Sequence, residues 1–169
     1  DTSNLDITEE TKIAPSSHYG ISKFTSEELL RKAAKNRETP LLVLRPCMIY
    51  GPGHIGLPYG PDQMVDSLVK NNQVKIFGDG YDRRDFLFIN DFVEITKNFV
   101  FDNCCGTYNL GTGDNYSPWD IIKVLRKITG IDFAVIKLKR TKPKINQKLD
   151  ISKLKGVLKD YVFTSLETG

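Results

Sequence analysis

Cysteine is scarce in this sequence and long apolar runs are missing, and both absences narrow the class of protein. The three cysteines, Cys47, Cys104 and Cys105, are odd in number and lack the spacing of a metal site. This usage is typical of a reducing compartment, so we expect a cytoplasmic protein that binds no metal. No segment reaches the roughly 20 apolar residues of a membrane-spanning helix, and the polar, acidic start DTSNLDITEE is unlike a signal peptide. We therefore expect no membrane partner.

An excess of charge of one sign is also missing. The formal net charge is +3, with 27% charged and 40% hydrophobic residues, as in an ordinary globular protein. One basic run, KLKRTKPK at 137–144, is typical of a solvated loop and less often of an anion-binding edge. This balance gives no reason to expect nucleic acid as a partner. The 169 residues suffice for one domain with a core, or for part of a larger one.

Helical and strand patterns alternate along the chain. Apolar spacing predicts helices at 19–36, 63–71, 91–101 and 117–130, with Asp91 and Ser117 as caps and Gly130 closing the last. Short apolar or alternating runs predict strands at 40–46, 74–77, 85–89, 107–111 and 133–138. The continuous run at 40–46 is typical of a strand buried on both faces. Such alternation predicts an α/β protein with a largely parallel sheet.

The stretch SSHYGISKF, residues 16–24, places Tyr19 and Lys23 four positions apart. On a helix these two side chains face the same way, about 5–6 Å apart at Cβ. A lysine ammonium at that distance stabilises a phenolate, which brings a tyrosine into range for acid–base work on an alcohol. The same lysine could hold a ribose hydroxyl of a cofactor. Taken alone, the pair also fits a surface tyrosine beside a solvated lysine, and this second interpretation is the commoner one.

Four motifs change this balance through their order and spacing. They are PSSHYGISK, LLVLRPCMIYGPG, IFGDGYDRRDFLFINDF and GTYNLGTGD. Together they resemble the extended short-chain dehydrogenase/reductase family. More narrowly, the chain is similar to its NAD-dependent sugar-nucleotide epimerases and dehydratases, such as UDP-glucose 4-epimerase. The resemblance extends from about Ile13 to the end of the chain.

The resemblance implies roles for individual residues. Tyr19 would be the active-site base, Lys23 its partner and a cofactor ligand, and Pro46 and Cys47 would lie against the nicotinamide of NAD. The implied substrate contacts are Met48, where many relatives carry asparagine, the segment from Val74 to Phe77 along the base, Arg84 on the diphosphate, and Asn109. An arginine suits a diphosphate because its planar fork donates in bidentate geometry. Arg83 is interpreted as a solvated neighbour, His18 and His54 as polar surface, and the loop at 50–61 as a connection near the active site.

The chain also departs from the family pattern. The glycine-rich nucleotide fingerprint is absent, as is the serine or threonine expected upstream of Tyr19. A second phosphate-binding arginine is missing near KINQKLD, where Lys144 or Lys148 could act only as a point charge. We therefore expect only the C-terminal half of an enzyme, inactive by itself.

The expected fold is α/β: the C-terminal part of a Rossmann-type parallel sheet and a small mixed α/β substrate-binding domain. The first comprises residues 1–50 and about 85–115, and the second residues 51–84 and 116–169. The expected activity is that of an NAD-dependent epimerase or dehydratase acting on a nucleoside-diphosphate sugar through a 4-keto intermediate. The intact enzyme is expected to be a homodimer with Phe24 at its interface. Two alternatives stay open, an extended reductase of a non-sugar alcohol and a non-catalytic binding protein on the same fold.

Overall fold

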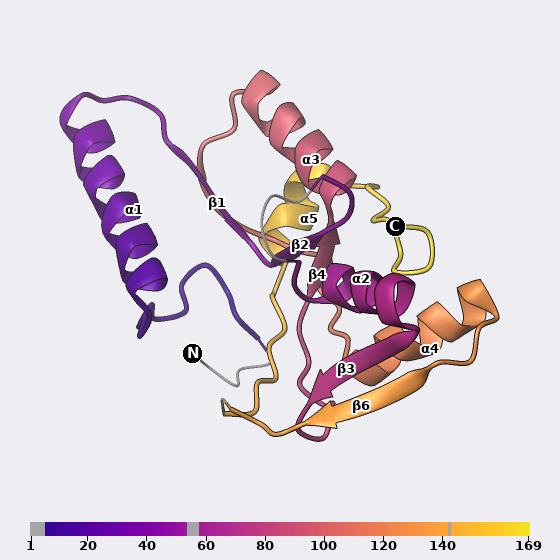
Figure 1. Cartoon of the computed structure of the whole chain (residues 1–169). Coiled ribbons are helices and arrows are strands. Elements are labelled where there is room, and N and C mark those ends of the chain that lie inside the picture. Colours follow the sequence, from indigo (N-terminus) through magenta and orange to yellow (C-terminus); the bar gives the residue numbers. More distant parts are fainter. Residues whose placement is uncertain (1–5, 54–57, 142) are drawn as a thin grey trace.

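A computed structural model describes residues 6–53, 58–141 and 143–169. Five helices and six strands are assigned in these ranges (Figure 1). The helices are α1 (His18–Asn36), α2 (Pro61–Asn71), α3 (Ile89–Phe101), α4 (Pro118–Thr129) and α5 (Ser152–Leu158). The strands are β1 (Leu42–Pro46), β2 (Met48–Tyr50), β3 (Gln73–Phe77), β4 (Phe86–Phe88), β5 (Gly106–Leu110) and β6 (Ala134–Leu138).

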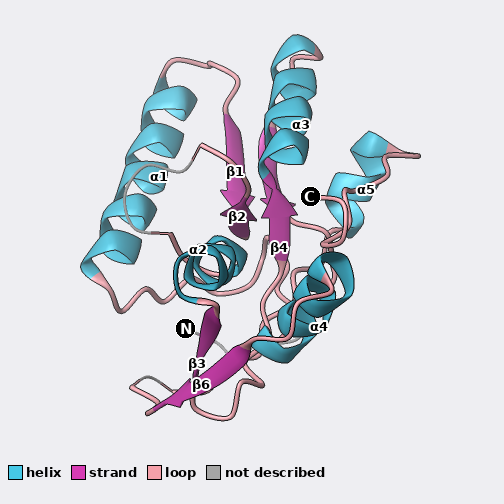
Figure 2. Cartoon of the chain, turned by 45° about the vertical axis from the view of Figure 1, so that its right-hand side comes forward, coloured by secondary structure: helices cyan, strands magenta, loops and turns pink. Residues whose placement is uncertain are grey.

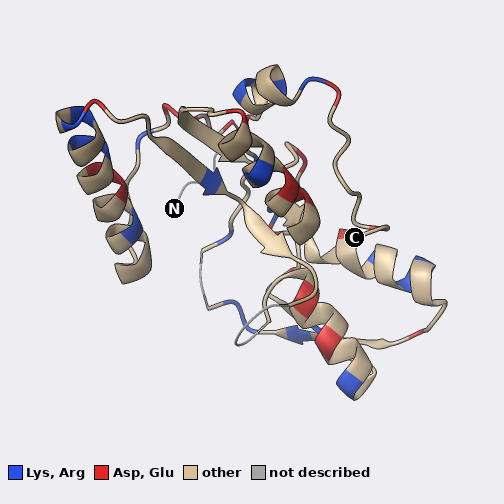
Figure 3. Ribbon diagram, turned by 90° about the horizontal axis from the view of Figure 1, so that it is seen from above, with Lys and Arg blue, Asp and Glu red and all other residues tan. Residues whose placement is uncertain are grey.

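The strands form three parallel pairs, β1 with β5, β2 with β4, and β3 with β6. The helices lie around these pairs, and β3–β6 forms a separate layer with α4 beside it (Figure 2). The predicted α/β class with parallel strands is confirmed. Basic and acidic residues are spread over most elements and do not gather in one region (Figure 3). Within the described ranges, none of the helices combines the length and the apolar character needed to cross a bilayer.

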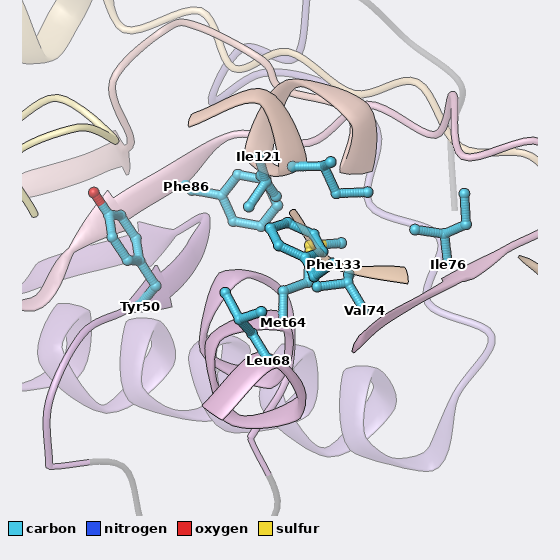
Figure 4. Packing of buried hydrophobic residues seen from close by; sticks show 9 residues of the cluster. Tyr50, Met64, Leu68, Val74, Ile76, Phe86, Ile121 and Phe133 are labelled. Atoms are coloured by element: carbon cyan, nitrogen blue, oxygen red, sulfur yellow. The ribbon is translucent and has the colours of Figure 1, made fainter. Parts of the chain in front are cut away.

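Two hydrophobic cores organise the chain. The first core comprises Tyr50, Met64, Leu68, Val74, Ile76, Phe86, Ile121, Ile122 and Phe133, contributed by α2, α4, strands β2, β3 and β4, and the residue before β6 (Figure 4). The second core comprises Leu87, Ile95, Phe99, Tyr108, Leu110, Ile151 and Leu154. The predicted division into two domains stays a prediction. The two cores do not follow its bounds throughout: Tyr50 and Phe86 belong to the first core, and residues 149–163 contribute to the second core together with α3 and β5.

Helix α4 shows why part of the sequence prediction was accurate. The Ser117 hydroxyl accepts a hydrogen bond from the Asp120 amide, and the Asp120 carboxylate accepts one in return from the Ser117 amide. Gly130 ends the helix in the left-handed conformation that glycine adopts without strain. Both ends of α4 thus lie where the capping residues predicted them.

Two predictions about other elements, α3 and β1, were wrong. Asp91 does not cap α3, because the helix begins earlier, at Ile89. The Asp91 carboxylate instead accepts hydrogen bonds from the Tyr161 hydroxyl and from the amide and hydroxyl of Thr164, which fastens the C-terminal segment to α3. Strand β1 is half-buried and not enclosed on both faces by the described chain. Helix α5 was not predicted at all.

Helix α1 stands to one side of β1, drawn in indigo in Figure 1. None of its 19 residues is buried by the chain that the structure describes. Its first turn is capped by Ser17, whose hydroxyl accepts from the Gly20 amide. The helix carrying Tyr19 and Lys23 therefore begins at a cap formed by the residue next to it. Within the described chain, no fully buried hydrophobic face anchors this helix.

Candidate functional site

A cavity of about 430 Å³ lies beside the first core, and we name it the Arg84 cavity. Its wall includes Met48, Tyr59, Gly60, Gln63, Met64, Lys75, Ile76, Phe77, Asp82, Arg84, Phe86, Tyr116, Pro118, Ile121, Arg140, Thr141, Pro143 and Ile145. Four of the apolar side chains, Met64, Ile76, Phe86 and Ile121, belong to the first core. The charged residues are Lys75 on β3 and Asp82, Arg84 and Arg140 on the segments after β3 and β6. This mixture of apolar wall and a few charged groups is typical of a small-molecule site.

Arg84 contributes to this cavity a cation that has no partner among the described residues. Its backbone pairs with Tyr116, but its guanidinium makes no hydrogen bond or ion pair with any residue in the described ranges. Burial lowers the pKa of the Arg84 guanidinium, and the charge of Asp82 partly offsets this effect. A half-buried cation without a partner is costly unless a ligand supplies the counter-charge, so Arg84 is available to an anionic ligand.

The neighbouring Arg83 points to other partners. Its guanidinium donates to the side chain and the backbone carbonyl of Asn115 and lies 3.1 Å from an Asp120 carboxylate oxygen. The interpretation of Arg83 as a solvated neighbour is therefore wrong. It supports the first turn of α4, because it contacts the residue that completes the capping box.

Arg140 is a second arginine in the Arg84 cavity, and sequence reasoning missed it. It donates to Asp82 at 2.9 Å and to Asp79 at 2.8 Å. Burial acts to raise the pKa of the Asp82 carboxyl, but the hydrogen bonds from Arg140 and the Ile145 amide, together with the charge of Arg140, outweigh burial and lower the pKa. Arg140 lies in the basic run at 137–144, and this run was the sequence signal that could have revealed it. An anion-binding edge was the less favoured interpretation of that run.

Residues 74–77 of β3 were predicted to contact a base, but their side chains do not all face the same way. Val74 is fully buried in the first core and lines neither cavity, so its side chain is not placed for a substrate contact. Lys75, Ile76 and Phe77 line the Arg84 cavity, and Phe77 is 48% exposed. A strand turns successive side chains to opposite faces, so Val74 and Ile76 are buried whereas Lys75 and Phe77 are exposed. Met48, also predicted as a substrate contact, lines the same cavity.

A second cavity, of about 940 Å³, lies between α1 and β1, and we name it the Tyr19 cavity. Its wall includes Ile7, Thr8, Ser17, Tyr19, Gly20, Lys23, Phe24, Ser26, Glu27, Leu30, the stretch 41–46, Phe92, Asn109, Gln147 and Leu149. Tyr19 is 74% exposed, and the Lys23 Nζ lies 5.7 Å from the centre of its ring. The structure thus brings Tyr19, Lys23 and Pro46 to one cavity, with both polar groups free to meet a ligand.

Two other predicted site residues have structural partners. Asn109 is buried beside the Tyr19 cavity, not in the Arg84 cavity, and its side-chain amide donates to the carbonyls of Ile7 and Asp150. Cys47 packs against the second core and lines neither cavity. Burial, together with the charge of Asp85, raises the pKa of the Cys47 thiol far above its ordinary range. Their roles at the substrate and at the nicotinamide stay predictions.

Of the two histidines, only His18 lies within the described residues, and it lines neither cavity. His18 is exposed and is the first residue of α1, while His54 and part of the loop at 50–61 lie outside the described residues. Within the described ranges, groups of three or more histidine, cysteine, aspartate or glutamate side chains that could hold a metal ion are absent.

The two cavities adjoin. Pro46 lines the Tyr19 cavity and Met48, two residues later, lines the Arg84 cavity. Likewise, Ile145 lines the Arg84 cavity and Gln147 lines the Tyr19 cavity. Two separate segments therefore pass from one cavity to the other, so an elongated ligand could place an anionic group at Arg84 and another group at Tyr19.

Comparisons with known proteins identify the family of the chain. A model of the NAD dependent epimerase/dehydratase family matches residues 2–111. An uncharacterized UDP-glucose epimerase of Bacillus subtilis is 31% identical over 96% of this chain and 52% of its own length. A dTDP-glucose 4,6-dehydratase of Neisseria meningitidis is 28% identical over 70% of this chain and 34% of its own.

Among solved structures, the chain is similar to a UDP-glucuronic acid 4-epimerase from Bacillus cereus in complex with UDP-glucuronic acid and NAD. The TM-score is 0.85 at 30% identity, over 97% of this chain and 53% of that one. The chain spans about half the length of the curated relatives named first among its matches, 52% and 44%.

Proposed function

The chain belongs to the NAD-dependent epimerase/dehydratase family, and we propose that the protein containing it oxidises a hydroxyl of a nucleoside-diphosphate sugar with NAD. The observation that carries the proposal is the adjoining pair of cavities. One holds Arg84, without a partner in the described chain, and Arg140, and the other holds Tyr19 and Lys23. A nucleotide sugar has the matching shape, because a diphosphate separates its base from its sugar.

NAD fits the residues of the Tyr19 cavity. The volume of about 940 Å³ lies near the upper end of the range for small-molecule sites, and its polar side chains are exposed to it. Lys23 and Tyr19 would hold the ribose of the cofactor, and Pro46 would pack near the nicotinamide. When bound, NAD supplies the acceptor for a hydride from the sugar carbon that bears the reacting hydroxyl.

The chain's own residues would handle the proton and the position of the sugar. Tyr19, as the phenolate, takes the proton of the sugar hydroxyl, most simply at C4, while Lys23 stabilises the phenolate through its positive charge. Arg84 and Arg140 hold the diphosphate, so the sugar reaches into the Tyr19 cavity between Met48 and Ile145. Loss of a proton and a hydride leaves a 4-keto sugar, from which inversion or elimination can follow.

The test is turnover by the whole protein with NAD. UDP-glucose, UDP-glucuronic acid and dTDP-glucose are offered separately, each beside its free sugar as a control. We expect a 4-epimer or a 4-keto-6-deoxy product from at least one nucleotide sugar, and none from the free sugars. Equal turnover of a free sugar, or turnover of none of the three, would overturn the proposal.

We also propose that the whole protein is a homodimer, as the resemblance implied, but through different residues. Phe24 is half-buried and lines the Tyr19 cavity, so its side chain does not point to a partner. Ile21 and Leu29 are 45% and 63% exposed on α1 and line neither cavity. Exposed apolar side chains on one helix are typical of an interface.

A substitution at this face tests the dimer. We expect Leu29→Asp to shift the whole protein toward the monomer in sedimentation, because the interface would then bury a carboxylate. Val69→Asp on α2, at a site that is 79% exposed, is the matched control and should leave the mass unchanged. A Leu29→Asp protein of unchanged dimer mass would show that the interface lies elsewhere.

A further inference from the structure

We propose that Glu27 is a positioning residue that holds the helix bearing Tyr19 and Lys23 at its working distance from the sheet. This inference rests on the proposed function for its kinetic consequence, but its structural basis is independent of that function. Glu27 lies on α1, the helix that buries none of its residues within the described chain. Within the described chain, its position must therefore depend on polar contacts as well as on partly buried side chains such as Phe24.

The Glu27 carboxylate is the centre of a cluster that joins α1 to the sheet. Arg45 on β1 donates to both of its oxygens, at 2.6 and 3.2 Å. Arg31, one turn further along α1, donates to Glu27 at 2.7 and 3.1 Å and also to the hydroxyl of Thr107 on β5. One carboxylate thus connects the helix directly to one strand and, through Arg31, to the strand paired with it.

The cluster is sheltered and fully charged. The side-chain exposures are 13% for Glu27 and 23% for Arg45. Hydrogen bonds from Arg45 and Arg31 hold the pKa of the Glu27 carboxyl below its usual value, against the opposing effect of burial. Arg45 also donates to the backbone carbonyl of Glu9, so the same guanidinium fixes the loop that leads into α1. Bidentate, charge-assisted hydrogen bonds of this kind define an orientation as well as a distance.

Helix geometry explains how Glu27 acts through the pair. Lys23 precedes it by one turn and Tyr19 by two, and all three line the Tyr19 cavity. At 1.5 Å per residue, Tyr19 lies roughly 12 Å along the axis from Glu27. A tilt of about 5° at Glu27 would therefore move Tyr19 by about 1 Å, a displacement that can cost about a hundredfold in rate.

The experiment compares Glu27→Gln with Glu28→Gln in the whole protein. Glutamine keeps the shape of Glu27 but turns an N–H donor toward an arginine, so the bidentate contact is lost. Glu28 is the matched control on the same helix, because its side chain is 56% exposed and lies 3.7 Å from Arg31. We expect Glu27→Gln to lower kcat by about ten- to a hundredfold with KM changed less than about twofold. Glu28→Gln should change neither.

Two further measurements separate positioning from a general loss of structure. Hydrogen exchange should speed up within residues 18–36 in Glu27→Gln, but not in Glu28→Gln and not in α4. On a Tyr19→Phe background, Glu27→Gln should cost little further activity, because it acts through Tyr19. An unchanged kcat or unchanged exchange in α1 would overturn the proposal. If the wild-type protein turned over no nucleotide sugar, the proposed function would fail, and the exchange comparison alone would decide the role of Glu27.

Discussion

The Arg84 cavity and the Tyr19 cavity adjoin, but their walls are held in place by different forces. The Arg84 cavity is walled by Met64, Ile76, Phe86 and Ile121, all buried members of the first core. The Tyr19 cavity has α1 as one wall, and this helix is tied to the sheet through Glu27, Arg31 and Arg45 without burying any of its residues in the described chain. Hydrophobic packing is non-directional and robust, whereas a few charge-assisted contacts set geometry and are lost individually.

The difference suggests a division of roles. A ligand's diphosphate would meet a preformed and rigid cavity. The reacting hydroxyl would meet a wall whose position depends on few contacts within this chain. Substitutions should therefore separate binding, reaction and stability between the two cavities, and the largest effect is expected at Tyr19.

Tyr19→Phe should lower the kcat of the whole protein by about 10²–10⁴-fold, because the phenol is the proposed proton acceptor and phenylalanine has none. Bound NAD should be retained, since the ring contributes the same packing without its hydroxyl. The measurement is kcat together with the NAD released on denaturation. Turnover within a few-fold of the wild type would remove the catalytic role of Tyr19.

Met64→Ala and Leu30→Ala compare the two walls directly in the 169-residue chain. Met64 is 7% exposed in the first core, so its truncation should lower the free energy of unfolding by about 2–5 kcal/mol. Leu30 is 57% exposed in the Tyr19 cavity, so its truncation should cost no more than about 0.5 kcal/mol. Urea unfolding measures both. If both variants lost the same free energy of unfolding, the two walls would not differ in how they are held. If Leu30→Ala lost stability only in the whole protein, residues outside this chain would cover the wall.

Arg84→Ala and Arg83→Ala separate binding from stability within the Arg84 cavity. Loss of the Arg84 contact should cost about 1.5–3 kcal/mol in binding, a rise in KM of roughly ten- to a hundredfold. Its removal should not destabilise the fold, because the guanidinium has no partner among the described residues. Arg83→Ala should do the reverse, since Arg83 binds Asn115 and Asp120. Steady-state kinetics and thermal unfolding of both variants distinguish the two arginines.

Local sequence signals predicted the elements whose ends are fixed by their own residues. Ser117 and Gly130 mark α4, and alternation marks β3, because capping and strand periodicity are properties of adjacent residues. Helix α5 was missed because its seven residues, SKLKGVL, include a glycine and lack a side-chain cap. Its place is determined by Leu154, which is fully buried in the second core, and such a contact leaves no mark on the local pattern.

The site residues were likewise predictable only where adjacent residues determine their position. The helix with Tyr19 and Lys23 was placed correctly from the apolar spacing of residues 19–36, although none of its residues is buried in the described chain. Arg140 was missed, and the partners of Asn109 were not predicted, because the surroundings of both residues come from distant segments. Asn109 is held by Ile7 and Asp150, and Arg140 reaches the Arg84 cavity only because β6 pairs with β3. Long-range pairing decides these contacts, and a single sequence does not encode it in its local pattern.

The smallest expected effect comes from the two capping serines, which make the same local bond in the two regions. Ser117 is 2% exposed within a capping box, so Ser117→Ala should lower the free energy of unfolding by about 1–2 kcal/mol. Ser17 makes its single exposed bond to Gly20, so Ser17→Ala should cost only about 0.5 kcal/mol at most. Because α1 contributes no buried residue to the described chain, fraying of its first turn leaves both cores intact.

The first turn of α1 also carries Tyr19, so Ser17→Ala should still lower kcat several-fold while Ser117→Ala leaves kcat unchanged. Urea unfolding and kcat of both variants provide the check, and a Ser17→Ala protein that lost stability as Ser117→Ala does would show that α1 is as firmly anchored as α4.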